Sequence, residues 1–205
     1  MKNYTITIDT GTTNTRVFLF NEKNEVAASA KSEIGVRITA IDGNNNRLKT
    51  AIRGCLEEVL KQAGITYDEV KKVVASGMIT SNVGLVEIPH VVAPASAEDL
   101  AEAAKSVLIE DVCPLPILFI PGVKNRDGKL DLATFESMDM MRGEEVETVA
   151  VVESLPKGQA YLLVLPGSHT KFVSVDCAGK ITGCLTTISG ELLSVITNDT
   201  LIADA

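Results

Sequence analysis

Apolar and polar residues alternate near the N-terminus in a pattern typical of β-strands. Residues 4–20 contain a β-rich run, a turn rich in glycine and threonine, and a second β-rich run. A polar turn over 21–24 and a third alternating run over 25–31 follow. The pattern therefore predicts that the chain opens with a three-stranded β-meander.

The same order of elements recurs near the C-terminus. Residues 160–175 again contain a strand, a glycine turn and a strand, and a polar turn over 176–179 leads to a strand over 180–187. In this alignment Arg16 corresponds to Lys171, and the second glycine turn is one residue shorter. The pattern indicates an internal repeat of one supersecondary unit.

Between the two repeats the hydrophobic period changes to that of helices alternating with strands. A helix with one apolar face ends at Gly64, and Thr66 and Glu69 have the spacing of a capping box. The pattern further predicts strands over 71–76 and 116–120, and helices over 96–108, 144–154 and 190–197. This alternation is typical of the α/β class.

We expect two lobes, residues 1–137 and 138–205, of which the second is incomplete. After its three strands and one helix, the chain stops at Ala205. A half-built lobe leaves apolar surface or sheet edges uncovered. We therefore expect either a chain with a missing C-terminal segment or one that completes itself in a homo-oligomer.

Net charge and the lengths of the apolar runs limit which kinds of partner the protein can have. The chain has 19 basic and 27 acidic residues and a net charge of −8, which argues against non-specific nucleic-acid binding. The N-terminus lacks a signal-peptide pattern and no apolar run is long enough for a membrane span, so we expect a cytoplasmic protein with a small-molecule substrate. The cysteine spacing indicates neither a disulfide framework nor a zinc site.

The two glycine turns carry the candidate chemistry. In the first, over 9–14, Gly11 allows close backbone approach, backbone N–H groups can form an anion-binding concavity, and Asp9 can hold Mg²⁺ through water. The second turn, over 167–171, also offers a glycine, hydroxyl groups and a basic side chain, but it has no carboxylate. Two such loops facing each other would grip a polyphosphate, although each can also be an ordinary hairpin connector. Neither turn matches the P-loop motif.

Several motifs resemble known families. I-D-T-G-T-T-N-T-R at 8–16 resembles the first phosphate loop of the superfamily that holds actin, the heat-shock chaperone ATPases and the sugar kinases. G-M-I-T-S-N-V-G at 77–84, M-R-G-E-E at 141–145, P-G-S-H-T-K at 166–171 and S-G-E-L-L at 189–193 together resemble the 2-dehydro-3-deoxygalactonokinases, sugar-acid kinases of bacterial galactonate breakdown. The resemblance runs from about Tyr4 to Ile202.

This resemblance implies a two-lobed actin-like ATPase (ribonuclease H-like) fold that uses Mg-ATP to phosphorylate the 6-hydroxyl of 2-dehydro-3-deoxygalactonate. The chain departs from the family pattern at Thr80, Leu85 and His90, in the presumed sugar region, and it lacks the family's adenosine-binding glycine segment. The alternatives are a catalytically silent sugar-acid-binding fragment or assembly subunit of the same fold, or a related phosphotransferase or phosphatase with another acceptor.

Glu144 is the candidate general base, because by resemblance it follows a glycine and opens a helix, and a carboxylate can accept the proton of an attacking hydroxyl. Asp139 is the reserve candidate. An acid in a first helical turn can instead merely complement the helix macrodipole, as Glu145 and Glu147 can.

The remaining roles are binding of the sugar acid and binding of the phosphates with Mg²⁺. Arg142 is expected to bind the substrate carboxylate, or alternatively to pair with a nearby glutamate. The sugar hydroxyls are assigned to Ser81, Asn82 and Glu87, of which the first two can also be a plain turn. The β- and γ-phosphates are assigned to Gly11, Thr12, Thr13 and Arg16 and, from the second loop, to Gly167, Ser168, His169, Thr170 and Lys171, while Asp9 holds Mg²⁺.

Overall fold

The computed structural model describes residues 3–128 and 131–202, which form two compact units. The first unit holds the residues up to Pro89 together with Leu100–Gly122, and the second holds His90–Asp99 and the residues from Val123 onward. The predicted lobe boundary between residues 137 and 138 stays a prediction.

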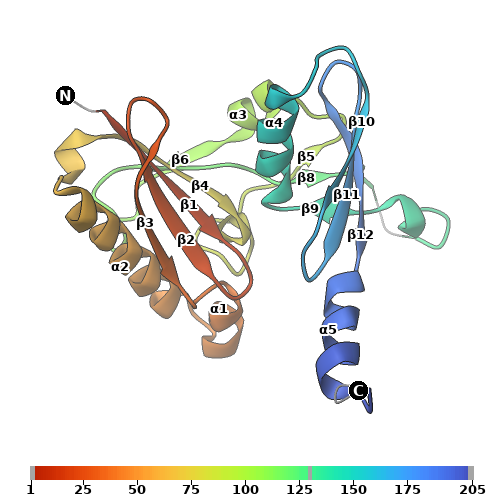
Figure 1. Cartoon of the computed structure of the whole chain (residues 1–205), viewed down its shortest axis with the longest axis horizontal. Helices are drawn as coiled ribbons and strands as arrows, with labels where there is room; N and C mark the ends of the chain where they lie inside the picture. The colour runs from red at the N-terminus through yellow and green to blue at the C-terminus, as the bar shows by residue number, and fades with distance from the viewer. Residues whose placement is uncertain (1–2, 129–130, 203–205) are drawn as a thin grey trace. The chain divides into compact units, whose positions relative to one another are not determined.

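A six-stranded mixed sheet forms the centre of the first unit (Figure 1). The strand order is β3-β2-β1-β4-β7-β6, with antiparallel pairing through the first three strands and parallel pairing of β1 with β4 and of β4 with β7. The predicted N-terminal meander is confirmed. The strands are β1 (Tyr4–Thr10), β2 (Thr15–Phe20), β3 (Val26–Ser32), β4 (Val70–Gly77), β6 (Lys105–Val107) and β7 (Ile117–Phe119).

Helix α2 (Asn46–Ala63) packs on β2 and β3 of this sheet, as Figure 1 shows. Its apolar face is the predicted one and meets a core that includes Ile6, Val17 and Leu19. Gly64 ends the helix in the left-handed conformation, and its N–H donates to Leu60 O. The buried residues of the helix are Leu48, Ile52, Cys55, Leu56, Val59 and Leu60.

Short helices connect these elements. Thr66 and Glu69 form the predicted capping box at η1 (Tyr67–Glu69), directly before β4. The others are α1 (Arg37–Asp42) after β3 and η2 (Met78–Thr80) after β4.

The helix predicted over 96–108 is too long. Helix α3 is Ala97–Ala103, and the next residues form β6, which pairs antiparallel with β7. Val107, which lies within the predicted helix, packs against the core of the first unit from β6. Pairing with a strand distant in sequence therefore overrides the local helical period.

The second unit contains two three-stranded sheets. The predicted second meander is confirmed as the antiparallel strands β10 (Tyr161–Leu165), β11 (Thr170–Val175) and β12 (Ile181–Thr187). The second sheet contains β5 (Val91–Val92), β8 (Val123–Lys124) and β9 (Met140–Met141). The helices are η3 (Phe135–Ser137), α4 (Glu144–Ser154), with the predicted bounds, and α5 (Ser189–Asp199).

The register of the two meanders confirms the difference between their turns. Asp9 lies opposite Arg16 in the first hairpin, whereas Leu165 lies opposite Lys171 in the second. The stretch between the paired residues is one residue shorter in the second hairpin. Leu165 therefore occupies the place of Asp9, and the second loop has no carboxylate there.

The second unit exposes apolar side chains, as expected. They lie on β10, on β12 and along α5, a helix that buries none of its residues and extends beyond the sheet in Figure 1. Exposed members include Leu162, Val164, Leu185, Leu192 and Leu193. No helix in the described part of the chain combines the length and the apolarity that a membrane span requires.

Candidate functional site

The first glycine turn lies at the end of the β1–β2 hairpin and carries an ion pair. Asp9 Oδ2 is 3.2 Å from Arg16 Nη1, and the two side chains lie opposite each other in register. The Asp9 side chain is 46% exposed and the Arg16 side chain is 52% exposed. Both charged groups therefore remain accessible to a ligand at the hairpin end.

The backbone of this turn is fastened to the segment that precedes α1. Gly11 O accepts from Val36 N at 3.1 Å, and Thr12 O accepts from Arg37 N at 2.9 Å. A Cβ on Gly35 would lie 2.4 Å from Gly11 O, so only glycine permits this approach. The side chains of Thr12 and Thr13 are exposed. The turn is thus held from behind while its hydroxyls face solvent.

Gly77 keeps space open beside the Asp9 carboxylate. It ends β4 with a φ of +85°, and a Cβ there would lie 2.7 Å from Thr10 O and 3.0 Å from Asp9 Oδ1. A side chain at this position would displace the strand end that carries Asp9.

The predicted sugar-contacting residues follow β4 and have different environments. Ser81 is buried, and its hydroxyl donates to Met78 O at 2.7 Å, which closes the turn after η2. Asn82 and Glu87 are exposed. The geometry fits a structural hydroxyl at Ser81 and leaves two polar side chains available from this segment.

The second glycine turn repeats the close backbone contact of the first. A Cβ on Gly190 would lie 2.0 Å from Gly167 O, and Glu191 N donates to Ser168 O at 2.9 Å. His169 Nε2 lies 3.2 Å from Glu191 Oε2. Sequence reasoning missed this contact, although a glycine after the third strand of each repeat, Gly35 and Gly190, was the available signal.

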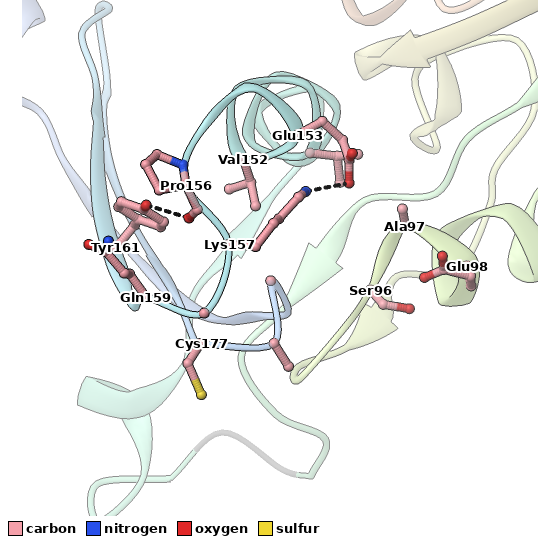
Figure 2. A pocket seen from close by; sticks show the side chains of 14 residues that line it. Ser96, Ala97, Glu98, Val152, Glu153, Pro156, Lys157, Gln159, Tyr161 and Cys177 are labelled. Carbon is pink, nitrogen blue, oxygen red and sulfur yellow. Dashed lines mark hydrogen bonds and ion pairs between the residues drawn. The ribbon is translucent and has the colours of Figure 1, made fainter.

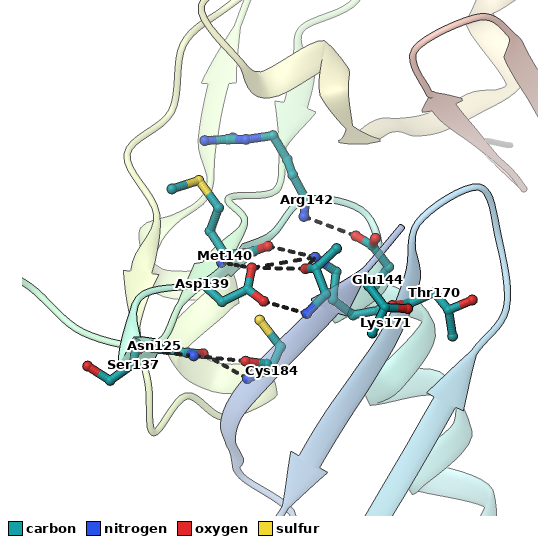
Figure 3. Close-up of polar contacts among 11 residues, drawn as sticks. Asn125, Ser137, Asp139, Met140, Arg142, Glu144, Thr170, Lys171 and Cys184 are labelled. Atoms are coloured by element: carbon teal, nitrogen blue, oxygen red, sulfur yellow. Dashed lines mark hydrogen bonds and ion pairs between the residues drawn. The ribbon is translucent and has the colours of Figure 1, made fainter. Parts of the chain in front are cut away.

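The Lys171 side chain is buried, and its ammonium group points away from this turn toward Met140 and Asp139 (Figure 3). Lys171 Nζ donates to Met140 O at 2.8 Å and to Thr186 Oγ1, and Asp139 Oδ1 lies 3.9 Å away. Asp139, the reserve base, accepts the backbone N–H and the hydroxyl of Thr186. Lys171 and Asp139 therefore both take part in contacts that link β11 and β12 to the segment at β9.

Two adjacent carboxylates at the start of α4 differ in how deeply they are buried. Glu144 is partly exposed, and its Oε2 accepts from Arg142 N at 3.1 Å. Glu145 is fully buried; its Oε2 accepts from Gly143 N at 2.7 Å, and its Oε1 has no hydrogen-bond partner. Burial raises the pKa of Glu145 to about 7. Of these two acids, only Glu144 can meet a substrate without rearrangement.

Arg142 lies against His90. Its Nη2 is 3.2 Å from His90 Nδ1, and burial, followed by the charges of Arg142 and Lys124, lowers the pKa of His90 to about 4. The imidazole is therefore neutral at pH 7, so Nδ1 can accept a hydrogen bond from the guanidinium. His90 thereby orients Arg142.

A cavity of about 170 Å³ lies elsewhere in the second unit (Figure 2). Its wall includes the end of α4 and the start of β10, where Lys157 pairs with Glu153 at 3.1 Å and the Tyr161 hydroxyl donates to Pro156 O at 2.7 Å. No residue predicted to act on phosphate or sugar lines it. This cavity is not the candidate site.

The buried carboxyl of Glu145 predicts a pH-dependent stability. Its pKa is about 7 in the folded chain against an ordinary 4.5, so the contribution of this carboxyl to the free energy of unfolding falls as the pH rises from about 4.5 to 7. Glu145→Gln cannot ionise and keeps an acceptor for Gly143 N. We expect its gain over the wild type to be roughly 2–3 kcal/mol larger at pH 8 than at pH 5, measured by urea denaturation.

The matched control for this experiment is Glu153→Gln. Glu153 lies on the same helix, but its side chain is 71% exposed. This variant is expected to keep the pH dependence of the wild type. An equal gain of Glu145→Gln at both pH values would contradict a raised pKa at this position.

A family model described as 2-keto-3-deoxy-galactonokinase matches residues 9–205. The chain is 27% identical over 202 residues to a probable 2-dehydro-3-deoxygalactonokinase of Rhizobium meliloti, covering 98% of this chain and 59% of the relative. It is 30% identical over 198 residues to 2-dehydro-3-deoxygalactonokinase of Escherichia coli, covering 96% of this chain and 58% of the relative. The chain thus spans less than two thirds of the length of these curated relatives.

Solved structures agree with this similarity. A putative 2-dehydro-3-deoxygalactonokinase from Sinorhizobium meliloti matches with a TM-score of 0.73 and 26% identity, covering 98% of this chain and 59% of that one. A Ppx/GppA phosphatase from Aquifex aeolicus matches with a TM-score of 0.50 and 14% identity, covering 95% of this chain and 55% of that one, and shows the fold alone. The predicted α/β actin-like ATPase fold is confirmed. The chain belongs to the 2-keto-3-deoxy-galactonokinase family.

Proposed function

We propose that this protein is an ATP-dependent sugar-acid kinase that phosphorylates the 6-hydroxyl of 2-dehydro-3-deoxygalactonate. The observation that carries the proposal is the family match over residues 9–205, which contains both glycine-turn loops and Glu144. The function rests on the family, and the residue roles rest on the geometry of each unit.

The first hairpin is the proposed site for Mg²⁺ and for phosphate oxygens of ATP. Mg²⁺ is commonly held by one or two carboxylates together with water and phosphate oxygens, and the accessible Asp9 carboxylate beside Gly77 fits that donor set. The bound ion would neutralise charge that develops on the transferred phosphoryl group. Thr12, Thr13, Gly11 and Arg16 would bind the phosphate oxygens.

The second hairpin is proposed to bind phosphate oxygens through its backbone and exposed side chains. Gly167, Ser168 and His169 are exposed at its tip, and Thr170 is partly exposed. His169 Nε2 lies 3.2 Å from Glu191 Oε2, a contact that can orient its ring. These groups can donate hydrogen bonds to phosphate oxygens, and residues 167–171 themselves contain no carboxylate.

Glu144 is the proposed general base. A carboxylate that is partly exposed at a helix start can reach a substrate hydroxyl and accept its proton as the oxygen attacks. Its Oε2 already accepts Arg142 N, which fixes the side chain close to the backbone turn. The buried Glu145 lacks this access.

The sugar acid is proposed to bind through Arg142, Asn82 and Glu87. The Arg142 guanidinium, oriented by His90, suits a carboxylate because it offers a planar set of donors. Asn82 and Glu87 would bind hydroxyl groups, while Ser81 holds the turn that carries Asn82.

We also propose a cytoplasmic location, since the reaction consumes ATP. The exposed apolar side chains of β10, β12 and α5 support the expectation that further polypeptide covers this surface, either a second copy or a segment present in the longer relatives.

The test is an ADP-release assay on the 205-residue chain with Mg-ATP and a panel of sugar acids. Release that depends on 2-dehydro-3-deoxygalactonate supports the proposal. Release with a different acceptor alone supports a related kinase. Binding of the sugar acid without any ADP release contradicts kinase activity of this chain and favours a silent binding module.

A further inference from the structure

Lys171 corresponds to Arg16 in the repeat, yet the two cations have opposite environments. The Arg16 side chain is 52% exposed, whereas the Lys171 side chain is 6% exposed. Two of the three N–H donors of the Lys171 ammonium are used by Met140 O and Thr186 Oγ1. To bind a phosphate, Lys171 would have to give up both of these partly buried hydrogen bonds.

Asp139 completes a compact polar cluster around this ammonium. Its Oδ1 lies 3.9 Å from Lys171 Nζ and accepts the Thr186 hydroxyl at 2.9 Å, and its carboxylate also accepts the backbone N–H groups of Thr186 and Met140. Figure 3 shows these contacts converging at one point. The cluster joins β11, which carries Lys171, to β12 and to the start of β9.

A second pair of hydrogen bonds joins the residue after β8 to β12. Asn125, which follows β8, donates from Nδ2 to Cys184 O at 2.8 Å and accepts from Cys184 N at 2.7 Å (Figure 3). Burial, with the Asp139 carboxylate next, raises the pKa of the Cys184 thiol to about 12, in keeping with a site that water reaches poorly. Weak screening in such surroundings strengthens the attraction between Lys171 and Asp139.

The cluster lies immediately before the proposed base in the chain. Lys171 holds the carbonyl of Met140, and β9 continues through Arg142 and Gly143 into Glu144 at the start of α4. Gly143 has a φ of +119°, and the N–H groups of Arg142 and Gly143 bond to the carboxylates of Glu144 and Glu145. The position of this turn therefore depends on where β9 is anchored.

We propose that Lys171, paired with Asp139, is a positioning residue that anchors β9 and thereby places Arg142 and Glu144 for catalysis, instead of contacting phosphate. This inference rests on the proposed kinase function for its catalytic consequence. Its structural part, the anchoring of the turn before α4, is independent of any activity.

Lys171→Met tests both parts. We expect kcat to fall at least tenfold while KM for ATP changes less than threefold, because the loss affects the base and not the phosphates. We also expect hydrogen exchange of the amides over 140–145 to accelerate at least tenfold, while exchange in the β1–β2 hairpin stays unchanged. Lys180→Met is the matched control, since Lys180 is in the same unit and its side chain is 44% exposed.

A milder variant covers the case in which Lys171→Met does not fold, since removing one partner of a buried ion pair is strongly destabilising. Thr186→Val keeps both charges and removes only the hydroxyl that bonds to Lys171 and Asp139. If Lys171 is a positioning residue, Thr186→Val should also lower kcat and accelerate exchange over 140–145, though by less. If Lys171 binds phosphate directly, neither effect is expected.

Two results would overturn the inference. One is unchanged exchange over 140–145 in the folded variants. The other is a tenfold or larger rise in KM for ATP at unchanged kcat, which would identify Lys171 as a phosphate ligand. If the wild-type chain shows no turnover, the kinase proposal fails for this chain, and the exchange comparison still decides whether Lys171 anchors the turn.

Discussion

Glu144→Gln is expected to lower kcat by about 10²–10⁴-fold, because glutamine cannot accept the proton of the attacking hydroxyl. Glutamine has nearly the same size, and its carbonyl oxygen can keep the hydrogen bond from Arg142 N that Glu144 Oε2 accepts at 3.1 Å. We therefore expect KM for ATP and for the sugar acid to change little. ADP release at saturating Mg-ATP and sugar acid measures the effect.

Glu153→Gln is the matched control, since it makes the same change at the other end of α4, where Glu153 pairs with the exposed Lys157. Its kcat is expected to stay within twofold of the wild type. A Glu144→Gln variant that retains more than a tenth of the wild-type kcat would show that proton removal does not depend on this carboxylate.

Asp9→Asn is expected to lower kcat about 10²-fold at ordinary magnesium concentrations and to raise the concentration of Mg²⁺ needed for half-maximal activity. Loss of the charge removes a few kcal/mol of attraction for the ion, and each 1.36 kcal/mol corresponds to about tenfold. The change also removes the ion pair with Arg16 at 3.2 Å. A magnesium titration of ADP release at fixed ATP measures both effects.

Asp42→Asn provides the comparison for Asp9→Asn. Asp42 also belongs to the first unit and pairs with an arginine, Arg47, at 3.4 Å, but it has no predicted role in phosphate binding. Its magnesium dependence is expected to match that of the wild type. If Asp9→Asn behaves in the same way, the magnesium site lies elsewhere.

Local patterns in the sequence were sufficient to predict both meanders and helix α4. The strands alternate in hydrophobicity and end at polar turns, and the helix starts directly after Gly143, so each signal lies within the element itself. The segment after Ala103 was predicted wrongly because its conformation depends on pairing with β7, whose residues pair with positions ten to fourteen residues earlier in the chain. A helical period alone carries no information about such a partner.

For the candidate site too, the sequence predicted the features that depend on neighbouring residues and missed those that depend on residues distant in the chain. The sequence identified the glycine turns and the two acids at the start of α4, but only burial separates Glu144 from Glu145. The direction of the Lys171 side chain depends on Met140 and Thr186, which no spacing rule connects to it. Contacts between residues distant in sequence therefore decide the role of Lys171.

The close approach of Gly35 to the first loop, and of Gly190 to the second, has an electrostatic consequence. Because a trans peptide group is rigid, a carbonyl held on one side directs the N–H of the same group to the other side. Gly11 O, Thr12 O and Ser168 O are all held in this way, which directs the N–H groups of Thr12, Thr13 and His169 away from the helices behind them. Oriented peptide dipoles thus supply positive potential without any added charge. A protein whose net charge is −8 can in this way offer a polyphosphate an attractive surface that a count of its charged side chains does not reveal.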